Sequence, residues 1–180
     1  MKTKRIVWQT AVAALVLTSA PLIAADFGSN KETRGQLSAK DYRFVADAAR
    51  GSMQEAALGE LAKQKGGSQS VRDFGQRMVA DHSKAADELK QIVTTKGAMA
   101  PTELSRRENS ELERFEKLSG RDFDKEYAEH MVKDHKKDAK EFEAAAKDLS
   151  DPDLKSFAQK TLTTIQEHLR MAQNMEASVK

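Results

Sequence analysis

The sequence predicts an all-α fold, and three observations lead to this expectation. Apolar residues recur at helical spacing over four long stretches of the chain. The chain has only three prolines and nine glycines, and aromatic residues make up 6% of it. Near most of the expected helix boundaries stands one of two signals. A serine with an aspartate three residues later marks a start, and a glycine marks an end. Together these features favour long helices separated by short turns.

The first 25 residues have the pattern of a signal peptide. Lys2, Lys4 and Arg5 provide a positive start, an apolar run follows from 6 to 17, and the small residues Ala24 and Ala25 come next. We expect cleavage near Ala25, no transmembrane span after cleavage, and export to the bacterial envelope, with the periplasm as the natural destination. The chain has no cysteine, so neither a disulfide nor a lipid-modified N-terminus is expected.

Residues 26–37 are polar and contain glycine, which predicts a flexible lead-in before a single four-helix-bundle domain at 38–178. Four long helices are expected at 38–65, 70–97, 122–147 and 150–176, and a short one at 103–118. Ser38 and Ser70, each with an aspartate three residues later, are expected to cap the first two. Pro152 suits the first turn of the last helix.

The two halves of the domain resemble each other weakly at an offset of 83 residues. This offset superposes Phe74 on Phe157 and Glu55 on Asp138. Two helical hairpins are therefore expected, joined by a long crossover that contains the short helix. A long crossover between hairpins is the ferritin-like variant of a four-helix bundle, although a simple up-down bundle with a capping helix remains open.

Composition excludes several classes of function. Without Lys2, Lys4 and Arg5 the chain has 27 basic and 28 acidic residues, so its net charge is 27 − 28 = −1. A nearly neutral surface argues against nucleic acid as a partner, and leaves an envelope protein or a second copy of the chain as candidate partners. No phosphate-binding glycine loop, serine elbow or cysteine nucleophile is present, so no catalytic residue is indicated.

Each long helix carries metal-ligand-type residues inside its apolar stripe. At 100° per residue, five such side chains are expected to face the bundle interior: Glu55, His82, His135, Asp138 and His168. His130 points away from the same face. At 1.5 Å per residue these groups lie at similar distances from their turns, so they are expected to meet near the middle of the bundle. Buried imidazoles and carboxylates need partners, which makes this cluster the candidate site.

Four segments carry a family resemblance: FVADAARGSMQEAALGELA, SVRDFGQRMVADHSKAADEL, FDKEYAEHMVKDHKKDAKEFE and DPDLKSFAQKTLTTIQEHL. Over residues 39–175 the chain resembles the exported, ferritin-like domain-of-unknown-function family 4142, often labelled predicted outer membrane proteins. The two Met-Val-x-Asp-His strings at 78–82 and 131–135 are the most specific features. The resemblance implies a bacterial envelope protein with a ferritin-like bundle, and it implies no activity.

Three interpretations of the candidate site stay open, and the third, a redox or hydrolytic enzyme, further requires an open coordination position and access for a substrate. Di-iron proteins of the ferritin-like group place a carboxylate three residues before a ligand histidine, where this chain has Val79 and Ile165. The first interpretation is a non-catalytic protein, with stress tolerance as a candidate role, whose buried histidine and carboxylate network fixes the packing. The alternative is a mononuclear site for zinc, iron or manganese, held by Glu55, His82, Asp138 and either His135 or His168.

Overall fold

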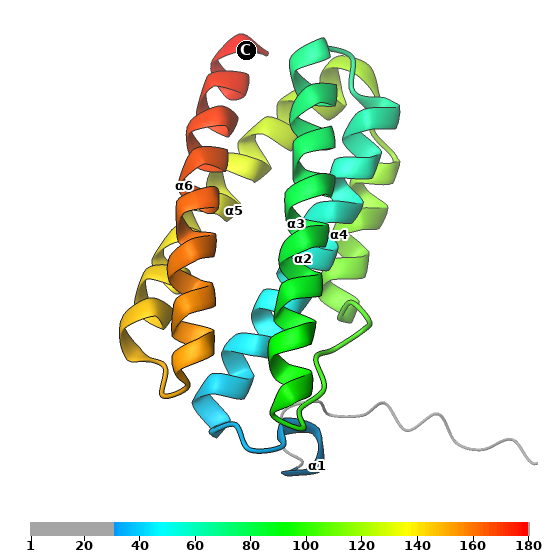
Figure 1. Ribbon diagram of the computed structural model, residues 1–180. Coiled ribbons are helices and arrows are strands. Elements are labelled where there is room, and N and C mark those ends of the chain that lie inside the picture. Colours follow the sequence, from blue (N-terminus) through cyan, green and yellow to red (C-terminus); the bar gives the residue numbers. More distant parts are fainter. Residues whose placement is uncertain (1–30, 180) are drawn as a thin grey trace, which may run out of the picture.

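The structure is a computed structural model that describes residues 31–179, and this part of the chain is all-α (Figure 1). It contains six helices: α1 Lys31–Arg34, α2 Ala39–Lys65, α3 Gln69–Thr95, α4 Arg106–Glu116, α5 Gly120–Asp148 and α6 Pro152–Ser178. None of these helices combines the length and the apolar character needed to cross a membrane. The expected signal peptide at 1–25 lies outside the described residues.

The four long helices form two antiparallel hairpins, α2 with α3 and α5 with α6, as the repeat predicts (Figure 1). The turn between α2 and α3 meets the start of α5, where Gly66 and Gly120 form an isolated backbone bridge. The turn between α5 and α6 meets the start of α2, where Lys40 Nζ donates to the carbonyl of Asp148. The two turns therefore lie at opposite ends of the molecule.

Side-chain caps set the helix starts, and not all of them are the expected ones. Ser38 accepts from the N–H of Asp41, as predicted. The cap of the second long helix lies two residues earlier than expected, at Ser68 rather than Ser70, so the helix begins at Gln69. In α6, Asp151 accepts from the backbone of the first turn, so the helix begins at Pro152. In each case a side-chain oxygen of the residue directly before the helix accepts from the N–H groups of its first turn.

The crossover between the hairpins contains α4, which covers α2 and α5. Phe115 of α4 is fully buried and packs edge-on against Phe123 and Tyr127 of α5. On its other side, Gln54 of α2 donates to Glu111 at 2.8 Å. This short helix therefore closes one side of the bundle.

The chain just before α2 is more structured than the sequence predicts. Residues 31–34 form α1, and the N–H of Gln36 donates to the carbonyl of Lys96 at 3.0 Å. Leu37 is only 6% exposed and belongs to the core. The expected flexible lead-in thus differs from the structure over 31–37, because one apolar side chain and a backbone contact anchor it.

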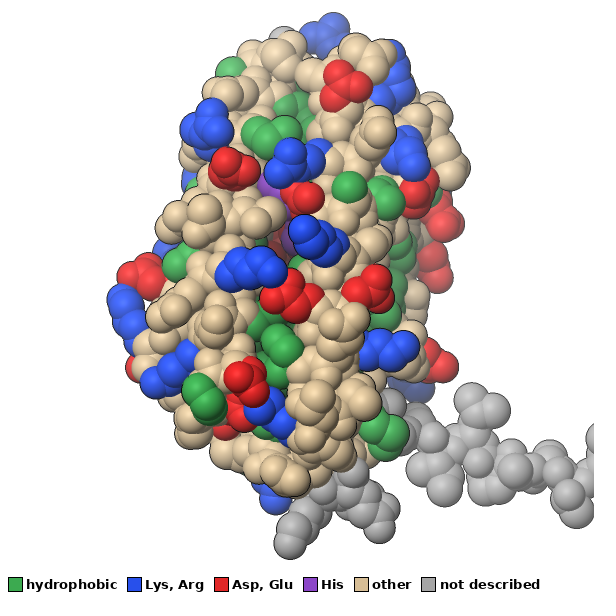
Figure 2. All heavy atoms as spheres, viewed as in Figure 1, with side chains coloured by type: hydrophobic (Ala, Val, Ile, Leu, Met, Phe, Trp, Pro, Cys, Tyr) green, Lys and Arg blue, Asp and Glu red, His purple; other side chains and the backbone are tan. Residues whose placement is uncertain are grey.

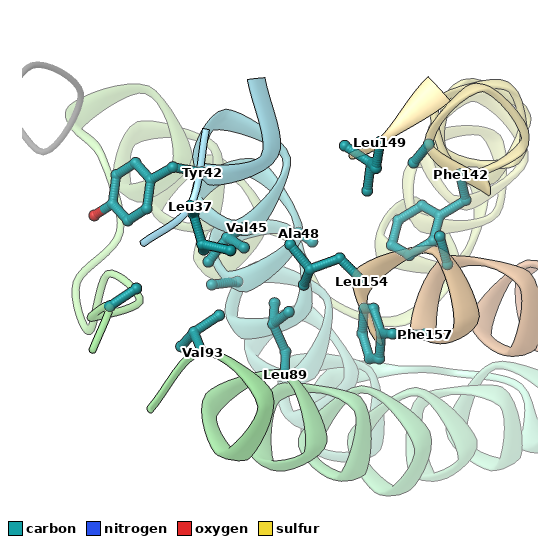
Figure 3. Packing of buried hydrophobic residues seen from close by; sticks show 14 of the residues in the cluster. Leu37, Tyr42, Val45, Ala48, Leu89, Val93, Phe142, Leu149, Leu154 and Phe157 are labelled. Atoms are coloured by element: carbon teal, nitrogen blue, oxygen red, sulfur yellow. The ribbon is translucent and has the colours of Figure 1, made fainter. Parts of the chain in front are cut away.

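The hydrophobic core is divided into two clusters. The lower one, shown in Figure 3, surrounds the turn between α5 and α6 and includes Tyr42, Val45, Leu89, Phe142, Leu154 and Phe157. The upper one surrounds the turn between α2 and α3 and includes Leu58, Phe74, Met78, Phe123, Tyr127 and Met131. Between these clusters, at mid-height of the bundle, lies a layer of polar side chains.

Candidate metal centre

The polar layer contains one side chain from each long helix: Glu55 of α2, His82 of α3, His135 of α5 and His168 of α6. All four are buried, with exposed fractions of 2%, 7%, 0% and 1%. Each side chain follows the apolar stripe of its helix, so the packing that buries the stripe also buries the polar group. The expected inward direction of these four residues agrees with the structure.

The three imidazoles form a compact triangle. Their ring centroids are 5.4 to 5.9 Å apart. One ring nitrogen of each histidine lies within 4.8 Å of a ring nitrogen of the other two. This spacing identifies His82, His135 and His168 as a group that could hold a metal ion.

In each of these rings one nitrogen has a partner. His82 Nδ1 donates to Glu55 Oε2 at 2.9 Å, and His168 Nε2 donates to Asp81 Oδ2 at 2.8 Å. His135 Nδ1 donates to the carbonyl of Met131 at 3.0 Å. These acceptors assign the tautomers, because a neutral ring that donates from one nitrogen carries a lone pair on the other.

The opposite nitrogen of each ring has no hydrogen-bond partner. These atoms are His82 Nε2, His135 Nε2 and His168 Nδ1, and all three are buried. Metal-ligating histidines commonly have this arrangement: one nitrogen faces the ion, and the other donates to a carboxylate or a carbonyl that orients the ring.

Asp81 links the layer to the surface. It lies on α3 at the seam with α6, where its side chain is 23% exposed and also pairs with Arg77. The sequence does not indicate its contact with His168, which lies 87 residues away. Arg77, Asp81 and His168 thus form a chain of contacts from solvent to the centre.

Burial and charge act against each other in the layer. Burial raises the pKa of Glu55, but the three neighbouring imidazoles lower it by more, to about 2. Burial lowers the pKa of His82, but Glu55 raises it by more, so the net shift is upward. Burial is the main cause that lowers the pKa of His168 to about 4. At neutral pH, Glu55 is therefore ionised and His168 is neutral.

A second group of potential ligands adjoins the imidazoles. One carboxylate oxygen from each of Glu55, Asp134 and Asp138 lies within 4.8 Å of those of the other two. The structure thus places Asp138, expected beside the histidines, among carboxylates. Burial is the main cause that raises the pKa of Asp134, and the charge of Glu55 adds to it. Burial and the charges of Glu55 and Asp134 raise the pKa of Asp138 to about 8.

Two pockets reach the polar layer from solvent. A pocket of about 320 Å³ between α2, α4 and α5 is lined by all three carboxylates and by His82. A second, of about 220 Å³, lies between α3 and α6 and is lined by Asp81, His82 and His168. Figure 2 shows histidine side chains at the bottom of this seam, among basic and acidic side chains. Small solutes therefore have two routes to the layer.

The fourth histidine lies outside the triangle. His130 Nδ1 is 3.3 Å from Glu111 Oε1 of α4, and its side chain is 12% exposed. This position agrees with the expectation that His130 faces away from the interior stripe. It provides a natural comparison for the three clustered histidines.

Comparison with known proteins gives one match. The profile of a family described as "Domain of unknown function (DUF4142)" matches residues 28–175. Neither the curated proteins nor the solved structures that were compared include a match to the chain.

Proposed function

The chain belongs to the DUF4142 family, whose description assigns no activity, and from the polar layer we propose that it binds one divalent transition-metal ion through His82, His135 and His168. The ion would lie in the middle of the bundle, between the two hydrophobic clusters. Glu55, Asp81 and the Met131 carbonyl would orient the three rings from behind.

One observation carries this proposal: three buried ring nitrogens lack partners in the same small region. Leaving a buried polar atom unpaired costs about 1–3 kcal/mol. A network that only fixed the packing would be expected to pair its members with one another. The Nε2 atom of His130 is also buried and unpaired, but only the rings of His82, His135 and His168 bring nitrogens within 4.8 Å of one another.

The donor set selects the kind of metal. Imidazole nitrogens suit zinc, copper, iron and nickel, whereas manganese prefers oxygen ligands. Zinc and iron, expected from the sequence, therefore fit the three histidines better than manganese does. Three histidine ligands also leave a four-coordinate ion with one position for water or another ligand. The two pockets lined by His82 lead toward this region.

We also propose that the protein acts in the bacterial envelope and that its fold is ferritin-like. The support for export is the signal-peptide pattern at 1–25. The support for the fold relationship is the pair of antiparallel hairpins joined by the long crossover through α4.

The test is metal content and metal-dependent stability. The protein, purified without chelator or affinity tag, is expected to take up one zinc ion per chain and to melt at a higher temperature with zinc than without it. His135→Ala should abolish both effects. His130→Ala is the matched control and should retain both, because His130 pairs with Glu111 outside the triangle.

Two results would overturn the proposal. One is the absence of stoichiometric zinc or iron uptake by a folded protein. The other is equal uptake by the His135→Ala variant. Either result would favour the other interpretation of the sequence, in which the three histidines belong to a network that fixes the packing.

A further inference from the structure

We propose that Glu55, Asp134 and Asp138 form a second cation site, next to the imidazoles, which takes an oxygen-preferring divalent ion such as Mn²⁺. This inference goes beyond the proposed function, because none of the three histidines is required as a ligand. The two sites share only Glu55, which contacts His82 and His135 on one side and belongs to the carboxylate group on the other.

The geometry brings three carboxylates from two helices together. Glu55 is on α2, and Asp134 and Asp138 are four residues apart on α5, on one face of that helix. One oxygen of each lies within 4.8 Å of those of the other two. When all three groups are ionised they repel one another at this distance, and a cation between them would offset that repulsion.

The carboxylates are poorly satisfied by the protein itself. Glu55 is 2% exposed, and its Oε1 atom has no hydrogen-bond partner, although it lies 3.5 Å from His135 Nδ1. Within residues 31–179, the Asp134 side chain makes no hydrogen bond or ion pair. The nearest positive partner of Asp138 is Lys137, at 3.4 Å, and the Lys137 side chain is 60% exposed and also binds Glu141. A buried carboxylate oxygen without a donor is the second, independent sign of a missing ligand.

The pocket that leads to these carboxylates is itself acidic. Its further charged lining consists of Asp47, Glu108, Glu111 and Glu141 against Arg107 and Lys137. The short helix α4 provides three of these six residues, so it both covers the pocket and adds to its negative potential. Clefts lined by one sign of charge raise the local concentration of the opposite ion.

The ligand type separates this site from the histidine site. Carboxylate oxygens and water suit manganese, magnesium and calcium, whereas imidazole suits zinc and iron. Manganese is the most useful probe, because free Mn²⁺ has a paramagnetic resonance signal that is lost on binding. The two sites can then be filled and counted separately.

The experiment is a Mn²⁺ titration of the zinc-loaded protein. We expect one Mn²⁺ per chain in addition to zinc. Asp138→Asn, which keeps the side-chain size, should weaken Mn²⁺ binding at least tenfold and leave the zinc content unchanged. Glu129→Gln, on an exposed part of α5 outside the pocket lining, is the control and should bind Mn²⁺ as the unaltered protein does.

The same titration of the metal-free His135→Ala variant keeps the two proposals distinguishable. If Mn²⁺ still binds there, the carboxylate site stands even where zinc binding fails. The proposal is overturned if no Mn²⁺ binds, or if Asp138→Asn binds it as tightly as the unaltered protein. The proposal is also overturned if the His135→Ala variant no longer binds Mn²⁺, since the ion would then occupy the histidine site.

Discussion

At the scale of single residues, the acceptor behind each imidazole determines what the layer can bind. His82 and His168 donate to carboxylates, whereas His135 donates to the carbonyl of Met131. A carboxylate makes the ring a stronger donor to a metal than a carbonyl does, because negative charge raises the basicity of the other nitrogen. The Asp81 contact is the one that can be removed with least disturbance, since Asp81 is partly exposed.

Asp81→Ala is therefore predicted to weaken zinc binding by about 10- to 100-fold, the range typical of lost outer contacts to a metal-bound histidine. His168 would lose the acceptor that fixes its tautomer. The measurement is zinc affinity by competition with a chromophoric chelator. Asp87→Ala, on an exposed part of the same helix, is the control. Equal zinc affinity in the Asp81→Ala and Asp87→Ala proteins would show that His168 is not a ligand oriented by Asp81.

The sequence predicts which residues face inward, but not which of them touch. The direction in which a side chain faces depends on the 3.6-residue period of its own helix. The direction of Glu55 or His135 can therefore be predicted from the neighbouring residues in the sequence. The contact of Asp81 with His168 depends on how α3 and α6 pack. The same holds for Asp138, whose approach to the carboxylates of Glu55 and Asp134 follows from the packing of α5 against α2.

At the scale of elements, each hairpin holds the turn of the other. Asp124 of α5 accepts from the N–H groups of Gly67 and Ser68 in the turn between α2 and α3. Asp41 of α2 accepts from the N–H of Ser150 in the turn between α5 and α6. The offsets 124 − 41 and 150 − 67 both equal 83, the period of the sequence repeat. The repeat therefore describes a reciprocal contact as well as two similar hairpins.

Helices α2 and α3 approach closely at two glycines, which gives a prediction about stability. A Cβ at Gly75 would lie 2.7 Å from the carbonyl oxygen of Gly59 and from Ala62 Cβ. Gly75→Ala should thus lower the free energy of unfolding by about 1–3 kcal/mol, as overpacking does. Gly51, on the same hairpin, has open space around it. Gly51→Ala should instead raise the free energy by about 0.5–1 kcal/mol, because alanine suits a helix interior better.

Urea unfolding of the metal-free protein measures both glycine substitutions on one scale. Shifts of the same sign in the two variants would contradict the close approach, because only Gly75 has backbone and side-chain atoms in the way. Zinc content should not change in Gly51→Ala, which makes it a useful check that the fold is intact.

The order and approximate ends of the helices could be predicted, because caps and periodicity are local. The choice between Ser68 and Ser70 as the cap of α3 could not, since Asp124 of the other hairpin fixes the backbone at Ser68. The burial of Leu37 was missed for a similar reason: its partners lie on helices far along the chain.

At the scale of the whole molecule, the polar layer divides the core in two. The orientation of the hairpins follows from the contacts at the two ends of the bundle, which no local pattern specifies. Hydrophobic residues of similar size could have filled the middle and joined the two clusters. Buried charged groups are often no better for stability than such residues, so the presence of this layer needs a reason other than packing.

The last prediction tests that reason by replacing the four layer residues together. In the quadruple variant, Glu55, His82, His135 and His168 are all changed to leucine. Without metal it is predicted to be as stable as the unaltered protein or more stable, by up to about 1–4 kcal/mol, because it removes a buried carboxylate and three unpaired nitrogens. Zinc should raise the melting temperature of the unaltered protein and leave that of the variant unchanged. Calorimetry of both proteins, with and without zinc, provides the comparison. A variant that is clearly less stable than the metal-free protein would mean that the layer serves packing, since its polar contacts would then contribute more than apolar contacts can.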